Sequence, residues 1–237
     1  GMILSELPQE TSSDIWELKQ YIITEAVANT TCEEAEEHPH TAEPADGSAP
    51  IKVVLMDLGA KRNICRELQK RGCDVTVVPS STKASDIIAM KPDGIMLSNG
   101  PGDPAENTEV IKEIRILRES GIPIFGICLG HQCIGEAFGA TIDHAKKIFH
   151  GKQSLVTHTG TSVFTGIDSP VKVARYHSLA IIPETVPDCL SVIAKTDDGE
   201  IMAVRHKEYK TVGLQFHPES VLTPDGYTMI KNFFDTL

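Results

Sequence analysis

The chain has 237 residues, of which 41% are hydrophobic and 23% charged, which is ordinary for a globular protein that can bury a core. No stretch approaches the length of about 18 apolar residues that marks a membrane span, and no secretory leader is recognisable, so membrane insertion and secretion are not expected. The net charge of −11 disfavours nonspecific nucleic-acid binding. The six cysteines lack the C-x-x-C spacing of zinc sites and are too sparse for a disulfide framework, which indicates a reducing cytoplasm and predicts no metal.

The first 50 residues differ in charge from the rest of the chain. They hold 11 acidic groups and one basic group, Lys19, which leaves 22 acidic and 21 basic groups for the remainder. Residues 15–23 follow polar N-cap candidates and have the pattern of a short amphipathic helix. Residues 32–50 lack periodicity and are interpreted as an acidic linker, in which His38 and His40 flank a proline and are better explained as a solvated loop than as metal ligands. We therefore predict an acidic extension and linker over residues 1–50 and a separate folded domain over residues 51–237.

After residue 50, short apolar runs alternate with helical patterns. Strands are predicted at residues 51–58, 73–79, 94–97 and 122–127, and helices at residues 60–71, 84–90, 106–119 and 132–138. Such alternation predicts an α/β fold in which helices cover both faces of a parallel sheet. The ligand of such a sheet binds beyond the carboxyl ends of the strands, so chemistry is expected near Ser98 and Cys128.

The second half is less regular. Strands are predicted around residue 155 and at residues 171–174, 190–194, 202–205 and 212–216, followed by a closing helix at residues 224–237.

A cysteine lies between the fourth strand and the helix that follows it. Residues 126–130 read Gly-Ile-Cys-Leu-Gly, the pattern of a nucleophile elbow, in which a sharp strand-to-helix turn exposes the central residue and glycines leave room for it. The nearby helix N-terminus favours the thiolate of Cys128. A buried structural cysteine is the alternative interpretation, and it is the one we prefer for Cys133, one turn further along.

A cysteine hydrolase needs a base and a group that orients the base. Residues 212–219 supply both, because His217 and Glu219 follow a strand, are two residues apart and can face the same way around Pro218. Glu219 would then bind one ring nitrogen of His217 while the other faces Cys128. A surface turn with a helix-capping glutamate is the alternative for this segment alone.

Gly-Ile-Cys-Leu-Gly-His-Gln at residues 126–132 and Gln-Phe-His-Pro-Glu-Ser at residues 215–220 resemble the class I, triad-type glutamine amidotransferases, from about residue 51 to the end of the chain. The resemblance implies a three-layer α/β/α, flavodoxin-like fold with a mostly parallel central sheet and no cofactor. It also implies the following roles: a catalytic triad of Cys128, His217 and Glu219; an oxyanion hole from the loop with Gly100 and Gly102 and from the amide of Leu129; and substrate contacts from Gln132 and from a strand with Tyr176, His177, Ser178 and Leu179.

The implied reaction is hydrolysis of glutamine through a glutamyl thioester. No P-loop and no Gly-x-Gly-x-x-Gly motif occur, so any ATP or acceptor chemistry is expected in a partner synthase that receives the ammonia.

The two halves disagree about that partner. Residues 56–64 and 97–104 resemble the small subunit of carbamoyl-phosphate synthase, whereas residues 150–152, 175–179 and 219–224 resemble the amidotransferase component of anthranilate or aminodeoxychorismate synthase. The second-half motifs, and the lack of the domain that precedes the amidotransferase in the carbamoyl-phosphate subunit, favour the chorismate group. A γ-glutamyl hydrolase that needs no synthase, and a binding module with a decayed site, are the rival functions.

Overall fold

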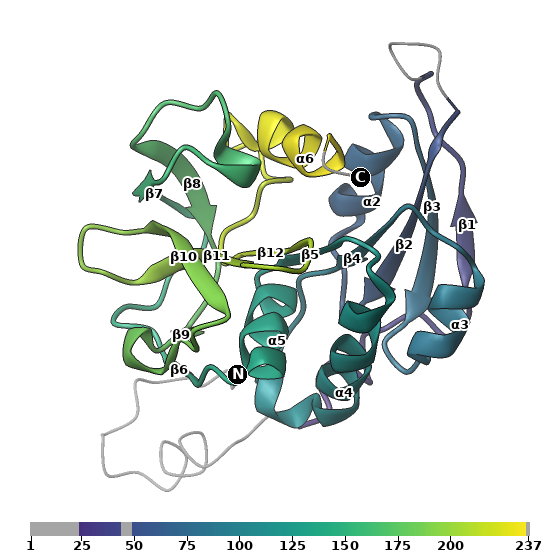
Figure 1. Ribbon diagram of the computed structural model, residues 1–237, viewed down its shortest axis with the longest axis horizontal. Helices are drawn as coiled ribbons and strands as arrows, with labels where there is room; N and C mark the ends of the chain where they lie inside the picture. Colours follow the sequence, from purple (N-terminus) through teal and green to yellow (C-terminus); the bar gives the residue numbers. More distant parts are fainter. Residues whose placement is uncertain (1–23, 44–48, 236–237) are drawn as a thin grey trace, which may run out of the picture.

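A computed structural model describes residues 24–43 and 49–235, which fold around one large sheet (Figure 1). Ten strands pair in the order β1-β3-β2-β4-β5-β12-β11-β10-β7-β8. Five neighbouring strands of this sheet are parallel: β2 (Ile51–Asp57), β3 (Cys73–Pro79), β4 (Gly94–Leu97), β5 (Ile124–Ile127) and β12 (Thr211–Leu214). In chain order these five follow the 2-1-3-4-5 arrangement of flavodoxin-like folds, as predicted.

Helices cover both faces of the sheet. Along β2, Val53 and Leu55 point to one face, and Val54 and Met56 point to the other, as the two-residue repeat of a strand requires. The first face packs against α2 (Arg62–Gln69) and α6 (Gly226–Phe234). The second face packs against α3 (Ala84–Ala89), α4 (Thr108–Leu117) and α5 (Leu129–Phe138). The expected three-layer α/β/α architecture is confirmed, and burial on both faces explains why the centre of β2, residues 53–56, is continuously apolar.

The second half adds antiparallel strands beside β12. They are β7 (Lys152–His158), β8 (Val171–Arg175), β10 (Leu190–Lys195) and β11 (Ile201–His206). A separate pair, β6 (Ile142–His144) with β9 (Leu179–Ile181), was not predicted. Short 3-10 turns complete the connections: η1 (Pro104–Glu106), η2 (Arg118–Ser120), η3 (Ser162–Phe164) and η4 (Pro183–Thr185).

The expected linker over residues 32–50 is wrong in part. Residues 36–38 form β1 (Glu36–His38), which pairs antiparallel with β3 and places Glu37 opposite Thr76. Further upstream, Ala26 and Val27 are buried. The segment has no apolar alternation because β1 lies at the sheet edge with exposed Glu36 and Glu37. The helix expected at residues 15–23 lies outside the described residues, and a domain boundary at residue 50 stays a prediction.

None of the helices in the described part of the chain is both long enough and apolar enough to cross a membrane.

Candidate active site

Cys128 occupies the turn between β5 and α5. Its backbone has φ 52° and ψ −100°, a conformation that a residue with a side chain rarely adopts and that is typical of functional turns. The N–H group of Cys128 donates to the carbonyl oxygen of Leu214 at 2.8 Å, which ties the turn to the end of β12. The predicted strand-turn-helix geometry is therefore confirmed, although α5 begins at Leu129 and not at residue 132.

Two glycines allow this turn to form. A Cβ atom at Gly126 would lie 2.6 Å from Ile134 Cδ1, and one at Gly130 would lie 2.5 Å from the carbonyl oxygen of Leu97. The N–H group of Gly130 also donates to the carbonyl oxygen of Ser98 at 3.1 Å. The glycines thus let α5 approach the end of β4 closely, as their place in the motif predicts.

His217 and Glu219 follow β12 and form a buried pair. The distance between His217 Nδ1 and Glu219 Oε1 is 2.7 Å. The N–H group of His217 donates to the carbonyl oxygen of Ala174 at 3.0 Å, and Thr223 Oγ1 donates to the carbonyl oxygen of His217 at 2.7 Å. The backbone of His217 is fixed from both sides, so its ring has a defined direction.

The charge state of His217 depends on its neighbours. Burial by itself lowers the pKa of the ring, but hydrogen bonding and charge from Cys128 and Glu219 outweigh it and raise the pKa to about 9. Nε2 has no strictly aligned hydrogen-bond partner among the described residues, yet Cys128 is close enough to stabilise the imidazolium. This arrangement is that of a thiol beside a base that a carboxylate orients.

A cavity of about 150 Å³ opens beside the sulfur of Cys128. It brings together most of the residues that the sequence assigned to the site. Its lining comprises Gly100, Pro101, Gly102, Cys128, Gln132, Tyr176, His177, Ser178 and Leu179. Leu129, His217 and Glu219 are not part of this lining. The cavity is small, as expected for an amino-acid substrate.

Two backbone segments lie beside Cys128, the first turn of α5 and the loop with Gly100 and Gly102. The N–H groups of the first turn of α5, which begins with Leu129, have no acceptor within the helix and carry partial positive charge. On the other side, Gly102 adopts φ 85°, and a Cβ at Gly100 would overlap the carbonyl oxygen of Leu58. Only glycines permit this loop to lie so close to β2, and the arrangement can stabilise a developing oxyanion.

The segment with Tyr176, His177 and Ser178 is not the strand that was expected. It is a loop between β8 and β9, and only Leu179 belongs to a strand. The rings of Tyr176 and His217 pack in a T-shaped arrangement with their centroids 4.9 Å apart, and Lys61 Nζ lies 3.7 Å from the centroid of Tyr176. Tyr176 thus covers one side of the base.

His177 is buried and neutral. Arg175 Nε donates to His177 Nε2 at 3.2 Å, so we assign the ring proton to Nδ1, which donates to the carbonyl oxygen of Leu179 at 2.9 Å. Burial, and then the charge of Arg175, lower the pKa of His177 to about 3. Arg175 is held in turn by an ion pair with Glu200. His177 therefore fixes the shape of the loop and carries no charge.

Gln215 is a site residue that the sequence interpretation missed. Its Nε2 donates to the Cys128 sulfur at 3.7 Å, and its Oε1 accepts from Gln132 Nε2 at 3.1 Å. Gln132 Nε2 also donates to the carbonyl oxygen of Leu179 at 2.8 Å. A signal was available, since residues 215, 217 and 219 alternate within the same motif, and two of them had been assigned to the site.

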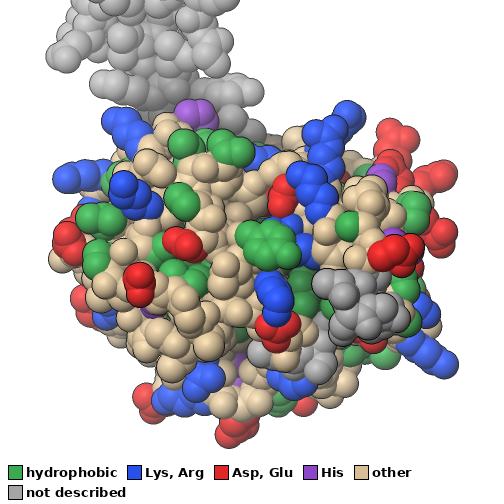
Figure 2. Space-filling view, turned by 90° about the horizontal axis from the view of Figure 1, so that it is seen from above, with side chains coloured by type: hydrophobic (Ala, Val, Ile, Leu, Met, Phe, Trp, Pro, Cys, Tyr) green, Lys and Arg blue, Asp and Glu red, His purple; other side chains and the backbone are tan. Residues whose placement is uncertain are grey.

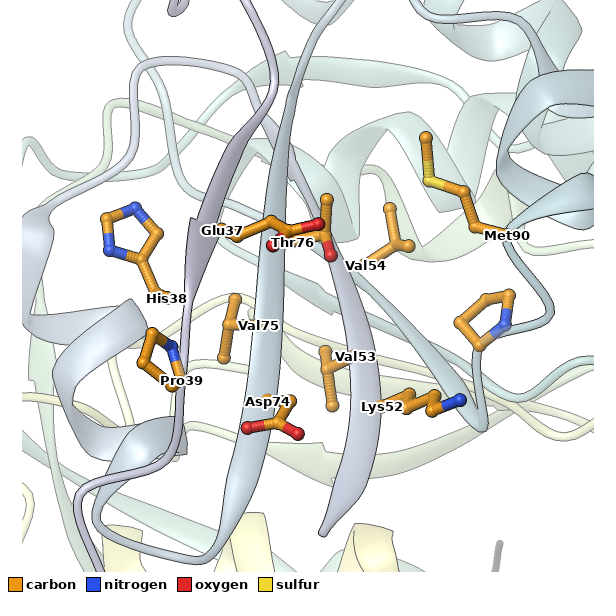
Figure 3. Close-up of a pocket in the computed structure, with 11 residues that line it drawn as sticks. Glu37, His38, Pro39, Lys52, Val53, Val54, Asp74, Val75, Thr76 and Met90 are labelled. Carbon is orange, nitrogen blue, oxygen red and sulfur yellow. The ribbon is translucent and has the colours of Figure 1, made fainter.

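Larger hollows lie elsewhere in the described part of the chain. A cavity of about 470 Å³ lies at the edge formed by β1, β3 and β2 (Figure 3), with Glu37, Lys52 and Asp74 among its lining residues. Within the described residues no group of three or more His, Cys, Asp and Glu side chains is placed to hold a metal ion. Figure 2 shows one face of the molecule, where Lys and Arg side chains are interspersed with Asp and Glu side chains. A single-sign surface for nucleic acid is not present on that face.

Comparison with known proteins identifies the family of this chain. The sequence model of the family "Glutamine amidotransferase class-I" matches residues 54–237. The aminodeoxychorismate/anthranilate synthase component 2 of Bacillus subtilis is 41% identical over 178 residues, which cover 73% of this chain and 90% of that protein. The bifunctional protein TrpGD of Thermotoga maritima is 46% identical over 164 residues, or 69% of this chain, but the match spans only 28% of TrpGD.

A solved structure shares the fold over most of its length. It is that of a putative GMP synthase subunit from Thermoplasma acidophilum, and it superposes with a TM-score of 0.72 at 27% sequence identity, covering 79% of this chain and 94% of that one. Family match, fold and site geometry agree: the chain belongs to the class-I glutamine amidotransferases, enzymes that hydrolyse glutamine.

Proposed function

We propose that Cys128, His217 and Glu219 are the catalytic triad of this glutaminase, and that the ammonia goes to a synthase that acts on chorismate. The observation that carries the first part is the position of Cys128, which is held in a strained turn next to the buried His217–Glu219 pair and beside a cavity of about 150 Å³.

The reaction follows from this geometry. The Cys128 sulfur attacks the side-chain carbonyl carbon of glutamine, and the resulting oxyanion is stabilised by amides of Leu129 and of the loop with Gly100 and Gly102. His217 gives its proton to the departing nitrogen, so the C–N bond breaks, ammonia leaves and a glutamyl thioester remains. His217 then takes a proton from water, whose oxygen attacks the thioester carbonyl and releases glutamate and the Cys128 sulfur.

Replacement of the nucleophile tests the triad. Cys128→Ala is expected to lower glutamine-dependent ammonia release by about a thousandfold or more, because the covalent path is lost. Cys133→Ala is the matched control, since Cys133 lies in the same helix and its burial raises the pKa of its thiol. Activity of Cys128→Ala equal to that of the unchanged chain would refute the mechanism.

The same assay separates the rival hydrolase. An amidotransferase prefers glutamine, whereas a γ-glutamyl hydrolase prefers γ-glutamyl peptides. A higher kcat/KM for the peptides would overturn the proposed substrate.

The names of the relatives support the choice of partner. The Bacillus subtilis protein is named for both aminodeoxychorismate and anthranilate synthase, and second-half motifs of this chain resemble the same group. The direct test mixes the chain with a chorismate-using synthase component and measures product formation with glutamine, with ammonium salts as the control for the synthase alone. Glutamine-dependent product supports the proposal. Glutamine use only with a carbamoyl-phosphate synthase large subunit contradicts it.

We also propose that the enzyme acts in the cytoplasm. All six cysteines are unpaired, which fits a reducing compartment.

A further inference from the structure

A short segment upstream of the family match packs against the active-site loops. The match begins at residue 54, but residues 24–32, here called the brace segment, contact the turn of residues 57–60. They also contact residues 98–102, here called the oxyanion loop. No acidic side chain of the brace segment takes part in either contact. The role of the segment is therefore separate from the acidic character of the first 50 residues.

Thr31 joins the brace segment to the ends of two strands. Its Oγ1 donates to the carbonyl oxygen of Asp57, at the end of β2, at 2.6 Å. The same oxygen accepts from the N–H group of Ser80, just after β3, at 2.9 Å. One hydroxyl therefore bridges three segments, and the adjacent N–H group of Cys32 donates to Asp57 Oδ2 at 2.7 Å.

Asp57 passes this constraint to the turn after β2. Its Oδ1 accepts from the N–H groups of Gly59 at 2.9 Å and Ala60 at 2.6 Å. Within the turn, the N–H group of Leu58 donates to Ser98 Oγ at 2.9 Å. The carbonyl oxygen of Leu58 lies directly behind Gly100, where a Cβ would overlap it. The turn thus packs against the oxyanion loop and holds it in position.

The brace segment also touches the oxyanion loop directly. A Cβ at Gly102 would lie 3.0 Å from Ala26 Cβ, and one at Gly59 would lie 2.8 Å from Thr30 Oγ1. Val27 is buried in the same apolar cluster as Leu129, the residue after Cys128.

We propose that the brace segment sets the geometry of the oxyanion hole and that Thr31 is its principal positioning residue. Thr31 touches neither substrate nor Cys128; it acts through Asp57 and the turn that carries the oxyanion loop. The proposal rests on the proposed glutaminase function. It adds that residues outside the matched family region contribute to transition-state stabilisation.

Thr31→Val tests the proposal because valine keeps the shape and removes both hydrogen bonds. The expected result is a fall in kcat for glutamine of about tenfold, less than the hundredfold or larger loss that removal of a whole oxyanion donor causes. KM should change less than twofold, since the oxyanion exists only in the transition state and the intermediate. Thr31→Ser keeps the hydroxyl and should restore kcat.

Alkylation of Cys128 by iodoacetamide provides the second readout. The thiolate attacks a saturated carbon in this reaction and no oxyanion forms, so a variant with a misplaced oxyanion loop should be alkylated at the unchanged rate. Mass spectrometry of the Cys128 peptide measures that rate, and urea unfolding measures stability. Thr165→Val is the control, because Thr165 Oγ1 is exposed and donates only to the carbonyl oxygen of Ser162 at 2.8 Å.

The outcomes are distinct. Loss of kcat with unchanged alkylation and rescue by serine supports the brace. Unchanged kcat in Thr31→Val, or parallel loss of turnover, alkylation and folded protein, overturns it. Absence of glutaminase activity in the unchanged chain would instead refute the proposed function.

Discussion

The His217 ring lies between two groups that favour its protonated form. Its pKa is raised from the ordinary value of 6.5 to about 9, and a raised pKa means that folding stabilises the imidazolium. This contribution to stability is fully present below pH 6.5 and is lost as pH rises through about 9. The proton that His217 gives to the leaving ammonia is lost over the same range, so turnover should decline with an apparent pKa of about 9.

Glu219→Gln should move this decline to lower pH. The carboxylate is one of the groups that raise the pKa of His217, whereas a glutamine amide retains a hydrogen bond and brings no charge. The measurement is kcat against pH for both proteins. Glu184→Gln, at an exposed position, is the control and should leave the profile in place. An alkaline limb at the same pH in Glu219→Gln would show that Glu219 does not tune His217.

At this scale the sequence predicted the members of the site better than their contacts. Cys128 lies between two glycines, and Pro218 separates His217 from Glu219. These local motifs were sufficient to assign the three residues to one site. Gln215 depends on Gln132 from another element, and His177 depends on Arg175 and Glu200. Gln132 and Glu200 are distant in sequence from the residues that they hold, and although Arg175 is only two residues from His177, no local pattern indicates their contact.

Helix α5 shows how a single element places the nucleophile. Gly130 and Gly135 both lie in this helix, but their surroundings differ. A Cβ at Gly130 would meet the backbone carbonyl of Leu97 at 2.5 Å, whereas one at Gly135 would meet the flexible end of the Ile181 side chain at 2.9 Å.

Gly130→Ala should therefore push α5 away from β4 and destabilise the fold by about 1–3 kcal/mol, the usual cost of overpacking. In Gly135→Ala the side chain of Ile181 can shift, and the better helix propensity of alanine offsets the crowding by up to about 1 kcal/mol. Urea unfolding of the two variants measures the difference. Equal stability would mean that α5 does not depend on close contact with the end of β4.

The element boundaries were less predictable than the elements. The start of α5 was placed at residue 132, yet the helix starts at Leu129. The unusual φ of Cys128 ends β5 and allows the helix to begin at once. The β6–β9 pair was missed because each strand has only three residues, too few to show a two-residue repeat.

At the scale of the whole molecule, the parallel centre was evident from alternating apolar runs, whereas its edge was not. The strand β1 covers the outer edge of β3, and its sequence, Glu-Glu-His, carries no apolar signal. Edge strands with charged side chains resist pairing with other molecules. The acidic composition that suggested a solvated linker therefore also suits an exposed edge strand.

Amide hydrogen exchange tests this edge. Successive N–H groups of a strand point to alternate neighbours, so in β3 one set faces β2 and the other faces β1. Pairing on both sides predicts slow exchange at Val75, Thr76 and Val77 alike. The opposite edge of the sheet, β8, is the control. There the N–H group of Ala174 donates to Thr223 Oγ1 at 3.0 Å. The N–H group of Lys172, two residues earlier, points to the same side of the strand and should exchange faster than that of Ala174. Rapid exchange at alternate residues of β3 would show that β1 does not pair in solution, and β3 would then be an open edge of the sheet.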